Sequence, residues 1–180
     1  PTDVPIPADY DGDGRAEVAI FRPETGTWFS LNLFNVVMTV SQWGINGDKP
    51  VPADFDGDGR TDLAVYRGGV WWIVRSTGGT ESRAFGIEGD RPVVGDYDGD
   101  GRVDLALVRN ALVVGVGVRK HWYILGSQSG YQSVLFGIDT DVASPADFDG
   151  DGRTDIAIYR GGQWWILQTA AGLLNVSFGT

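Results

Sequence analysis

A nine-residue pattern rich in carboxylates occurs four times in this 180-residue chain. The copies share the form D-[YF]-D-G-D-G-R-x-[DE] and run from Asp9 to Glu17, Asp54 to Asp62, Asp96 to Asp104 and Asp147 to Asp155. Carboxylates at alternate positions can fold toward one point, and the two glycines permit the tight curl because left-handed backbone angles cost glycine little. Oxygen atoms are the ligands that Ca²⁺ prefers. Each copy therefore predicts a calcium loop, and four copies predict about four Ca²⁺ ions.

The predicted ligands are the carboxylates at positions one, three, five and nine, together with the main-chain carbonyl of the arginine at position seven. The ninth residue is expected to close the site with both of its carboxylate oxygens. Mg²⁺ fits less well, because it resists a cage built mostly of protein atoms. A helix–loop–helix calcium site needs Glu at position twelve, where this chain is apolar, so hairpin loops are predicted. The candidate metal ligands are Asp9, Asp11, Asp13, Arg15, Glu17, Asp54, Asp56, Asp58, Arg60, Asp62, Asp96, Asp98, Asp100, Arg102, Asp104, Asp147, Asp149, Asp151, Arg153 and Asp155.

The charge of the chain follows from these loops. The formal net charge is −10, and each loop holds four of the 24 acidic residues. Four bound Ca²⁺ ions would bring the net charge from −10 to −2, so the acidity belongs mostly to the predicted metal sites. An acidic chain is a poor partner for nucleic acid. No apolar run is long enough to span a bilayer, so no membrane span is predicted.

Other residues recur with the loops. The loops begin 45, 42 and 51 residues apart, an Asp lies six residues before each loop start, and an Arg lies thirteen residues after it. An aromatic pair follows, as in Trp71-Trp72, and each repeat closes with an aromatic residue and Gly, as in Phe85-Gly86. A repeat of this length is typical of a propeller, a solenoid or an array.

Each repeat is predicted to hold four short antiparallel strands. In the second repeat these are an extended run over residues 50–55, then strands at 62–67, 70–75 and 81–85. Four strands in about 42 residues make one propeller blade. The predicted fold class is therefore an all-β propeller of four four-stranded antiparallel blades, either a closed four-bladed ring or part of a larger propeller. We expect one domain over residues 1–180, with repeats at approximately 1–44, 45–86, 87–137 and 138–180.

Two segments are unusually apolar. The third repeat has an insertion at residues 110–120, which predicts strands that project past the blade, and residues 31–40 of the first repeat are similarly apolar. Two interpretations stay open: a long hairpin without a partner, or a contact surface for a neighbouring molecule. The second interpretation rests on the observation that Val-rich edges exposed to water seldom stay unpaired, and its partners would be other copies or further repeats.

The loops and their surroundings resemble the FG-GAP repeat family, including the related repeats often found with VCBS domains. The resemblance rests on the F-G pair, on Gly47-Asp48-Lys49-Pro50-Val51 and on D-x-D-G-D-G-R-x-D-L-A, and it covers essentially the whole chain. It implies propeller blades with Ca²⁺ between the first two strands. It also implies an extracellular or cell-surface location and an adhesive or other non-catalytic role. Members usually build larger rings than four blades.

Other candidate sites are weaker. His121 is the single histidine, with no second His and no Cys to complete a zinc site. Asp3, Asp48, Asp90 and Asp141 recur with the period, so a structural turn role is expected rather than glycosidase-type catalysis. No motif for nucleophilic catalysis or nucleotide binding occurs, and we expect no enzyme.

Two function classes remain. One is a Ca²⁺-stabilised extracellular module that is structural or adhesive and assembles into a surface polymer or filament through its apolar hairpins. The other is a carbohydrate-binding, lectin-like propeller that uses exposed Trp residues. The aromatic pairs are expected to pack between blades, but adjacent side chains face opposite sides of a sheet, which leaves one ring of each pair available. Candidate partners are other copies of the chain, further repeats, glycans and cell-surface proteins.

Overall fold

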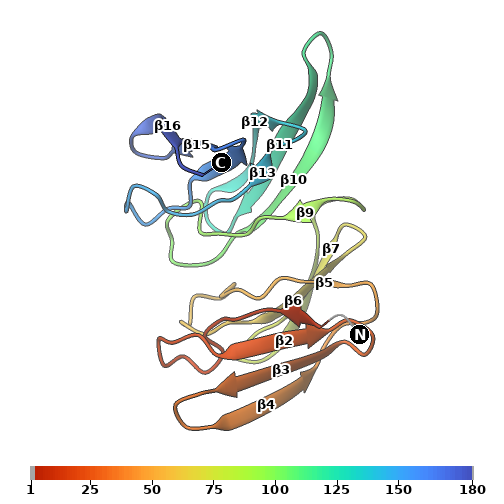
Figure 1. The fold of residues 1–180 in the computed structure, drawn as a ribbon. Coiled ribbons are helices and arrows are strands. Elements are labelled where there is room, and N and C mark those ends of the chain that lie inside the picture. The colour runs from red at the N-terminus through yellow and green to blue at the C-terminus, as the bar shows by residue number, and fades with distance from the viewer. Residues whose placement is uncertain (1–2, 180) are drawn as a thin grey trace. The chain divides into compact units, whose positions relative to one another are not determined.

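The computed structural model describes residues 3–179, and within that range it contains sixteen strands and no helix. The strands form four four-stranded antiparallel sheets, each with its strands in sequence order (Figure 1). The predicted all-β class with four propeller blades is thereby confirmed. The chain divides into two compact units, Pro1–Glu88 and Gly89–Thr180, each of which contains two blades.

The first unit contains the first two blades. Blade 1 consists of β1 (Val4–Pro5), β2 (Val18–Arg22), β3 (Thr27–Asn32) and β4 (Val37–Gln42). Blade 2 consists of β5 (Lys49–Pro50), β6 (Leu63–Arg67), β7 (Val70–Val74) and β8 (Thr80–Ala84). The innermost strand of blade 2 is shorter than predicted. After Pro50 the pairing continues only through the Val51 N–H, which donates to the Ala64 carbonyl at 2.8 Å, and a bridge between Ala53 and Asp62.

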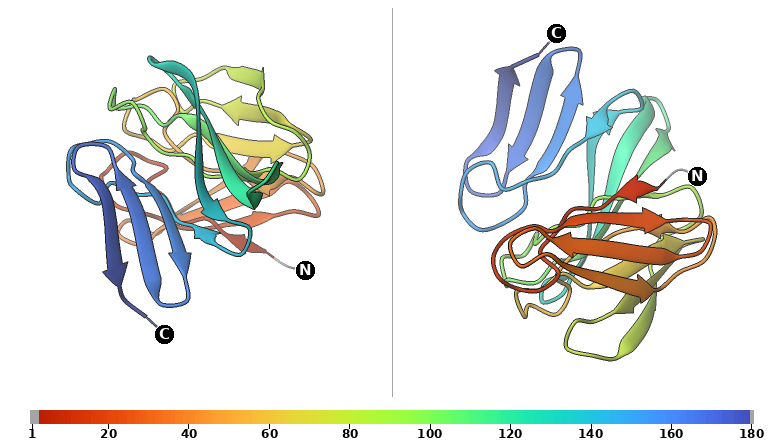
Figure 2. Two further views of the ribbon diagram at one scale, coloured as in Figure 1. Left: turned by 90° about the horizontal axis from the view of Figure 1, so that it is seen from above. Right: turned by 60° about the horizontal axis from the view of Figure 1, so that its bottom comes forward.

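The second unit contains the last two blades. Blade 3 consists of β9 (Arg91–Pro92), β10 (Leu105–Val113), β11 (Gly117–Gly126) and β12 (Gly130–Ile138). Blade 4 consists of β13 (Val142–Ala143), β14 (Ile156–Arg160), β15 (Gln163–Gln168) and β16 (Gly172–Ser177). Figure 2 shows β14, β15 and β16 side by side in one antiparallel meander, which is the arrangement that short hairpin turns dictate.

The aromatic pairs divide between the two faces of each blade because side chains alternate along a strand. On β7, Trp71 is fully buried whereas Trp72 is 36% exposed. The Trp71 indole N–H donates to the Phe85 carbonyl at 2.9 Å, which ties the strand to the closing aromatic residue. Trp28 packs in a core cluster with Val65 of the next blade, and Trp122 packs in one with Ile158. The predicted packing of aromatic rings between blades is confirmed at these positions, where the first ring of the pair is the one that packs.

The recurring Asp and Arg residues form an ion pair in every blade: Asp3 with Arg22, Asp48 with Arg67, Asp90 with Arg109, and Asp141 with Arg160. The carboxylate of Asp48 also accepts the Ile45 N–H at 2.8 Å, so the predicted turn role holds there. The Arg67 guanidinium lies 5.4 Å from the ring centre of Trp72. The arginine therefore links the buried carboxylate to the exposed aromatic residue.

The two apolar hairpins are largely exposed to solvent. Strands β10 and β11 pair out to Val113 and Gly117, so the insertion projects past the blade as predicted (Figure 1). Val114 at its tip is 94% exposed. In the β3–β4 turn, Phe34 is 81% exposed and Val36 has a φ of 57°, a strained value for a β-branched residue.

Candidate metal centres

Each nine-residue loop is a closed hairpin loop between the first and second strands of its blade. The residue before the loop pairs with the ninth residue: Ala8 with Glu17, Ala53 with Asp62, Gly95 with Asp104, and Ala146 with Asp155. Both glycines of every loop have φ between 78° and 86°. The left-handed curl expected from the glycines is therefore confirmed, and no side-chain-bearing residue would adopt it as readily.

The first Asp of each loop stabilises this backbone conformation by hydrogen bonds. In the first loop the Asp9 carboxylate accepts the Gly12 N–H at 2.7 Å on Oδ1 and the Gly14 N–H at 2.8 Å on Oδ2. The same two bonds form in the other loops, on Asp54, Asp96 and Asp147. The fifth residue adds a second tie, because the Asp13 carboxylate accepts the Arg15 N–H at 2.9 Å. The carboxylates are thus oriented by the loop's own main chain.

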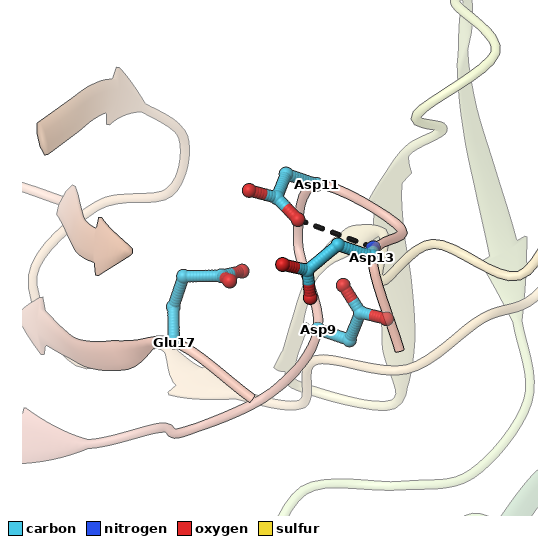
Figure 3. Close-up of side chains that lie close together, drawn as sticks. All are labelled: Asp9, Asp11, Asp13 and Glu17. Carbon is cyan, nitrogen blue, oxygen red and sulfur yellow. Dashed lines mark hydrogen bonds between the residues drawn. The ribbon is translucent and has the colours of Figure 1, made fainter. Parts of the chain in front are cut away.

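The structure brings carboxylates of each loop together, as Figure 3 shows for the first loop. One oxygen from each member lies within 4.8 Å of the others in the four groups Asp9, Asp11, Asp13 and Glu17; Asp54, Asp56 and Asp58; Asp96, Asp98 and Asp104; and Asp147, Asp149 and Asp155. Asp62, Asp100 and Asp151 are the predicted carboxylate ligands that lie outside these groups. Carboxylates at such distances repel one another strongly unless a cation or a proton separates them.

The ninth residue differs from the others because it is buried. Glu17, Asp62, Asp104 and Asp155 are at most 4% exposed. Asp62 accepts the Phe55 N–H at 2.9 Å on Oδ2 and the Ser76 N–H at 2.8 Å on Oδ1, so both oxygens already hold main-chain hydrogens. Burial and the neighbouring carboxylates of Asp56 and Asp54 raise the pKa of Asp62, against these hydrogen bonds. Each carboxylate oxygen keeps a further lone pair beside its amide hydrogen, so ligation by both oxygens stays a prediction.

The turn between the third and fourth strands supplies further partners that the sequence did not reveal. In blade 2 the Ser76 hydroxyl donates to Asp58 at 2.5 Å, and the Thr77 hydroxyl donates to Asp56. Because of the Ser76 bond, the pKa of Asp58 is lowered. Ser127 and Thr169 make the equivalent bonds to Asp100 and Asp151.

Blade 1 uses an amide instead of a hydroxyl, and its acceptor is the third residue of the loop and not the fifth. The Asn32 side-chain amide donates to Asp11 at 2.6 Å. The available signal in the sequence is a polar residue at the end of the third strand or just after it in every repeat: Asn32, Ser76, Ser127 and Thr169.

The donor set fits a hard cation. Oδ1 of Asp56 and Oδ1 of Asp98 are buried, and neither accepts a hydrogen bond from the described residues 3–179. A buried carboxylate oxygen without a partner is destabilising, so these atoms indicate a missing positive group. The loop ligands are all oxygen atoms, which suits Ca²⁺ or Mg²⁺ and not the softer metals.

The arginines at position seven of the four loops contribute main-chain groups to the loops. Their N–H groups donate to the fifth residue in all four loops. Their carbonyls remain predicted ligands. Two of the side chains reach the loop of the preceding blade: Arg60 donates from Nη2 to the Tyr10 carbonyl at 3.3 Å, and Arg153 lies against Gly99.

His121 has an ordinary structural surrounding. Its Nδ1 lies 3.0 Å from the Tyr123 hydroxyl, and the two rings stack with centres 4.3 Å apart. Burial and the nearby Arg109 lower its pKa, so the neutral ring is favoured. It belongs to none of the four metal-type groups that the described residues form.

A comparison with known protein families identifies the same repeats as the metal loops. A family model for the FG-GAP-like repeat matches residues 9–65 and residues 54–107. The two matches together span residues 9–107, more than half of the 180-residue chain, and each begins at the first Asp of a loop. No curated protein matches the chain. Among the described residues, no helix is long and apolar enough to cross a membrane.

Proposed function

Because the chain belongs to the FG-GAP-like repeat family, we propose that it is a non-catalytic extracellular module that binds about four Ca²⁺ ions, one per blade, and has a structural or adhesive role. The observation that carries the proposal is the convergence of three or four carboxylates in every loop. A bound dication offsets the repulsion between these carboxylates. It binds the folded loop only, because the carboxylates are close together only there. Ion binding therefore stabilises the fold.

Ca²⁺ is a better candidate than Mg²⁺ for these loops. Ca²⁺ takes six to eight oxygen atoms in flexible geometry, whereas Mg²⁺ demands an octahedron and keeps several waters. Three or four carboxylates and one main-chain carbonyl per loop provide most of a calcium shell. The partly exposed third and fifth residues, such as Asp56 and Asp58, leave access for water.

An extracellular location is consistent with this use of metal. The chain has no cysteine, so disulfides contribute nothing to its stability. Extracellular modules bind Ca²⁺ with dissociation constants on the order of 10⁻⁴ to 10⁻³ M, where the ion is abundant. Metal binding in each loop would then stabilise the blades in place of disulfides.

The calcium proposal is tested by thermal unfolding in three buffers. We expect a higher unfolding midpoint in 2 mM Ca²⁺ than in a chelator. With a dissociation constant of about 10⁻⁴ to 10⁻³ M, each site adds about 0.7–1.8 kcal/mol to the free energy of unfolding. An equal concentration of Mg²⁺ should give a much smaller rise. Identical midpoints in all three buffers would reject the proposal.

The adhesive role is supported by the two apolar hairpin tips. The first, Leu33-Phe34-Asn35-Val36, lies beside the first metal loop, because the Arg15 guanidinium lies 5.0 Å from the Phe34 ring centre. The second is Val113-Val114-Gly115-Val116. Isolated soluble proteins avoid such exposed apolar clusters. We infer that both tips contact other copies of the chain or further repeats. Contacts of a head-to-tail kind that do not close produce a filament.

Sedimentation velocity in Ca²⁺ distinguishes the roles of the tips. We expect concentration-dependent association of the native chain. Replacement of Val113, Val114 and Val116 by Ser should weaken it, and replacement of Leu33, Phe34 and Val36 by Ser tests the other tip in the same way. If the native chain stays monomeric at high concentration, the assembly proposal is wrong.

A carbohydrate-binding role is a second candidate, and two equivalent grooves favour it. The groove of the first unit has a volume of about 370 Å³ and the groove of the second about 400 Å³. Each is lined by an aromatic-Gly-Ile segment of one blade and by an Arg and a Trp of the next, namely Arg67 and Trp72 or Arg160 and Trp165. Largely apolar grooves of this size with a few polar groups suit small ligands.

Glycan-array binding tests this second candidate. We expect binding that is lost when Trp72 and Trp165 are both changed to Ala. Tyr131→Ala is the matched control, because Tyr131 is 61% exposed and lines neither groove. Absence of binding by the native chain in Ca²⁺, or equal loss in the control, would remove the carbohydrate-binding candidate.

A further inference from the structure

The metal loops of the two blades in a unit contact each other through their main chains. In the first unit the Thr61 N–H donates to the Asp9 carbonyl at 2.7 Å. Thr61 is the eighth residue of the second loop, between the predicted ligands Arg60 and Asp62. Asp9 is the first predicted ligand of the first loop. The bond thus joins the ligand-bearing segment of one site directly to that of the other.

The second unit repeats the contact. The Thr154 N–H donates to the Asp96 carbonyl at 2.6 Å, again from position eight of one loop to position one of the preceding loop. The two bonds lie in different units and form between loops of different sequence. The contact is therefore a property of adjacent repeats and not of one local arrangement.

A side chain reinforces each contact. Arg60 packs across the first loop so closely that a Cβ on Gly12 would lie 2.7 Å from its Cγ. Arg153 lies across Gly99 in the same way, where a Cβ would lie 3.0 Å from its Cγ. Gly12 and Gly99 therefore serve a second purpose besides the curl of their own loops, since they let the arginine of the next blade lie flat on the loop.

We propose that the two metal sites of each unit bind Ca²⁺ with positive cooperativity, transmitted through the Thr61–Asp9 and Thr154–Asp96 hydrogen bonds. This inference rests on the proposed calcium binding. An ion in the first site fixes the Asp9 carboxylate and with it the carbonyl that accepts from Thr61. An ion in the second site binds the predicted Arg60 carbonyl, which belongs to the same peptide group as the Thr61 N–H. The first ion to bind orders the shared bond, so the second ion binds to a segment that is already ordered.

Amide NMR of the full chain reads each site separately during a Ca²⁺ titration. The Gly14 N–H donates to Asp9 and reports the first site, and the Gly59 N–H donates to Asp54 and reports the second. Asp56→Ala removes a ligand of the second site without touching the first. In this variant we expect the Ca²⁺ concentration at the midpoint of the Gly14 transition to rise at least about 5-fold, which is the lower end of typical coupling between sites. Coupling is reciprocal, so Asp11→Ala should raise the Gly59 midpoint by the same factor.

The hydrogen bond itself is tested by Thr61→Pro, which lacks the N–H group. In this background Asp56→Ala should change the Gly14 midpoint by less than about 2-fold, well below typical coupling. Thr61→Ser retains the donor and should behave as the native chain. Asp149→Ala, read at the Gly101 amide, repeats the test in the second unit without any proline.

The outcomes separate the inference from the function on which it rests. If Gly14 and Gly59 respond to Ca²⁺ but each midpoint is unchanged by loss of the other site, the sites are independent and the inference is wrong. If neither amide responds to Ca²⁺ in the native chain, the calcium proposal itself fails. Coupling that persists at full strength in a folded Thr61→Pro variant would overturn the assigned hydrogen bond.

Discussion

Removal of Arg160 should destabilise the protein more than removal of its partner Asp141. The Asp141 side chain is fully buried, whereas the Arg160 side chain is 40% exposed. Asp141 accepts the Arg160 Nη2 hydrogen at 2.8 Å and the Ile138 N–H at 2.7 Å. Arg160→Met leaves a buried carboxylate with one main-chain donor. Asp141→Asn leaves a guanidinium that water can reach.

The expected magnitudes follow from this asymmetry. A buried ion pair that loses one partner costs about 3–5 kcal/mol. Because Arg160 is partly exposed, solvent screening reduces the value, and we expect about 2 kcal/mol for Arg160→Met. Asp141→Asn keeps an oxygen for the Ile138 N–H and should cost about 1 kcal/mol, the value of a typical hydrogen bond. For a chain of this length, about 2 kcal/mol lowers the thermal midpoint by about 4–8 °C.

Urea unfolding at constant Ca²⁺ measures both variants at pH 7, and a pH series adds a second check. Burial raises the pKa of Asp141, but the hydrogen bonds from Arg160 and from the Ile138 N–H, together with the positive charges of Arg160 and Lys120, outweigh burial and hold that pKa below its ordinary value of 3.8. The pair's stabilisation is therefore complete above about pH 4 and is lost as the pH falls through the lowered pKa. The difference in free energy of unfolding between the native chain and the Asp141→Asn variant should therefore shrink to zero as the pH falls through this pKa. Equal losses for the two variants, or a larger loss for Asp141→Asn, would refute the reasoning.

Three further perturbations have defined outcomes. Asp56→Ala should remove one Ca²⁺ ion per chain and leave the β-sheet circular dichroism unchanged, because repeat units carry much of their own stability; global unfolding would contradict this. Trp71→Phe removes a buried indole and its hydrogen bond to Phe85, and should lower the free energy of unfolding by about 2 kcal/mol; a loss below about 0.5 kcal/mol, the level of a surface change, would show that the site repacks. Ser76→Ala removes the hydroxyl donor to Asp58 and should weaken Ca²⁺ binding at the second site about 10-fold, as loss of a residue behind a metal ligand commonly does; unchanged affinity by calorimetry would limit Ser76 to the turn.

The sequence predicted the repeated features of the fold well. Blades, loop glycines and the burial of Trp71 follow from local rules: alternation along strands, positive φ at glycine, and a fixed spacing between repeats. Each rule acts within a few residues, so a single sequence carries it. The spacing of Asp141 and Arg160 was also visible, although the pattern suggested a turn and did not reveal the ion pair.

The contacts that the sequence did not predict join segments distant in the chain. The Ser76 hydroxyl reaches Asp58 across a blade, and the Thr61 N–H reaches Asp9 in the preceding loop. Such pairs depend on how a hairpin folds back over a loop, and the polar residue that recurs at the position of Ser76 does not by itself indicate which side chain it contacts. The full burial of Asp62 was missed for the same reason, because its two amide partners come from Phe55 and Ser76, on opposite sides in sequence. Ring closure and the main-chain ligand role of Arg60 stay predictions.

The central claim is that every loop holds one Ca²⁺ ion. The direct measurement is the number of ions bound per folded chain, by native mass spectrometry and by equilibrium dialysis with ⁴⁵Ca²⁺, on the native chain and on four variants that each lose the third-position Asp of one loop. The account predicts about four ions for the native chain and one fewer for each variant. A native chain that binds no Ca²⁺ at millimolar concentration, or four variants with unchanged stoichiometry, would contradict it.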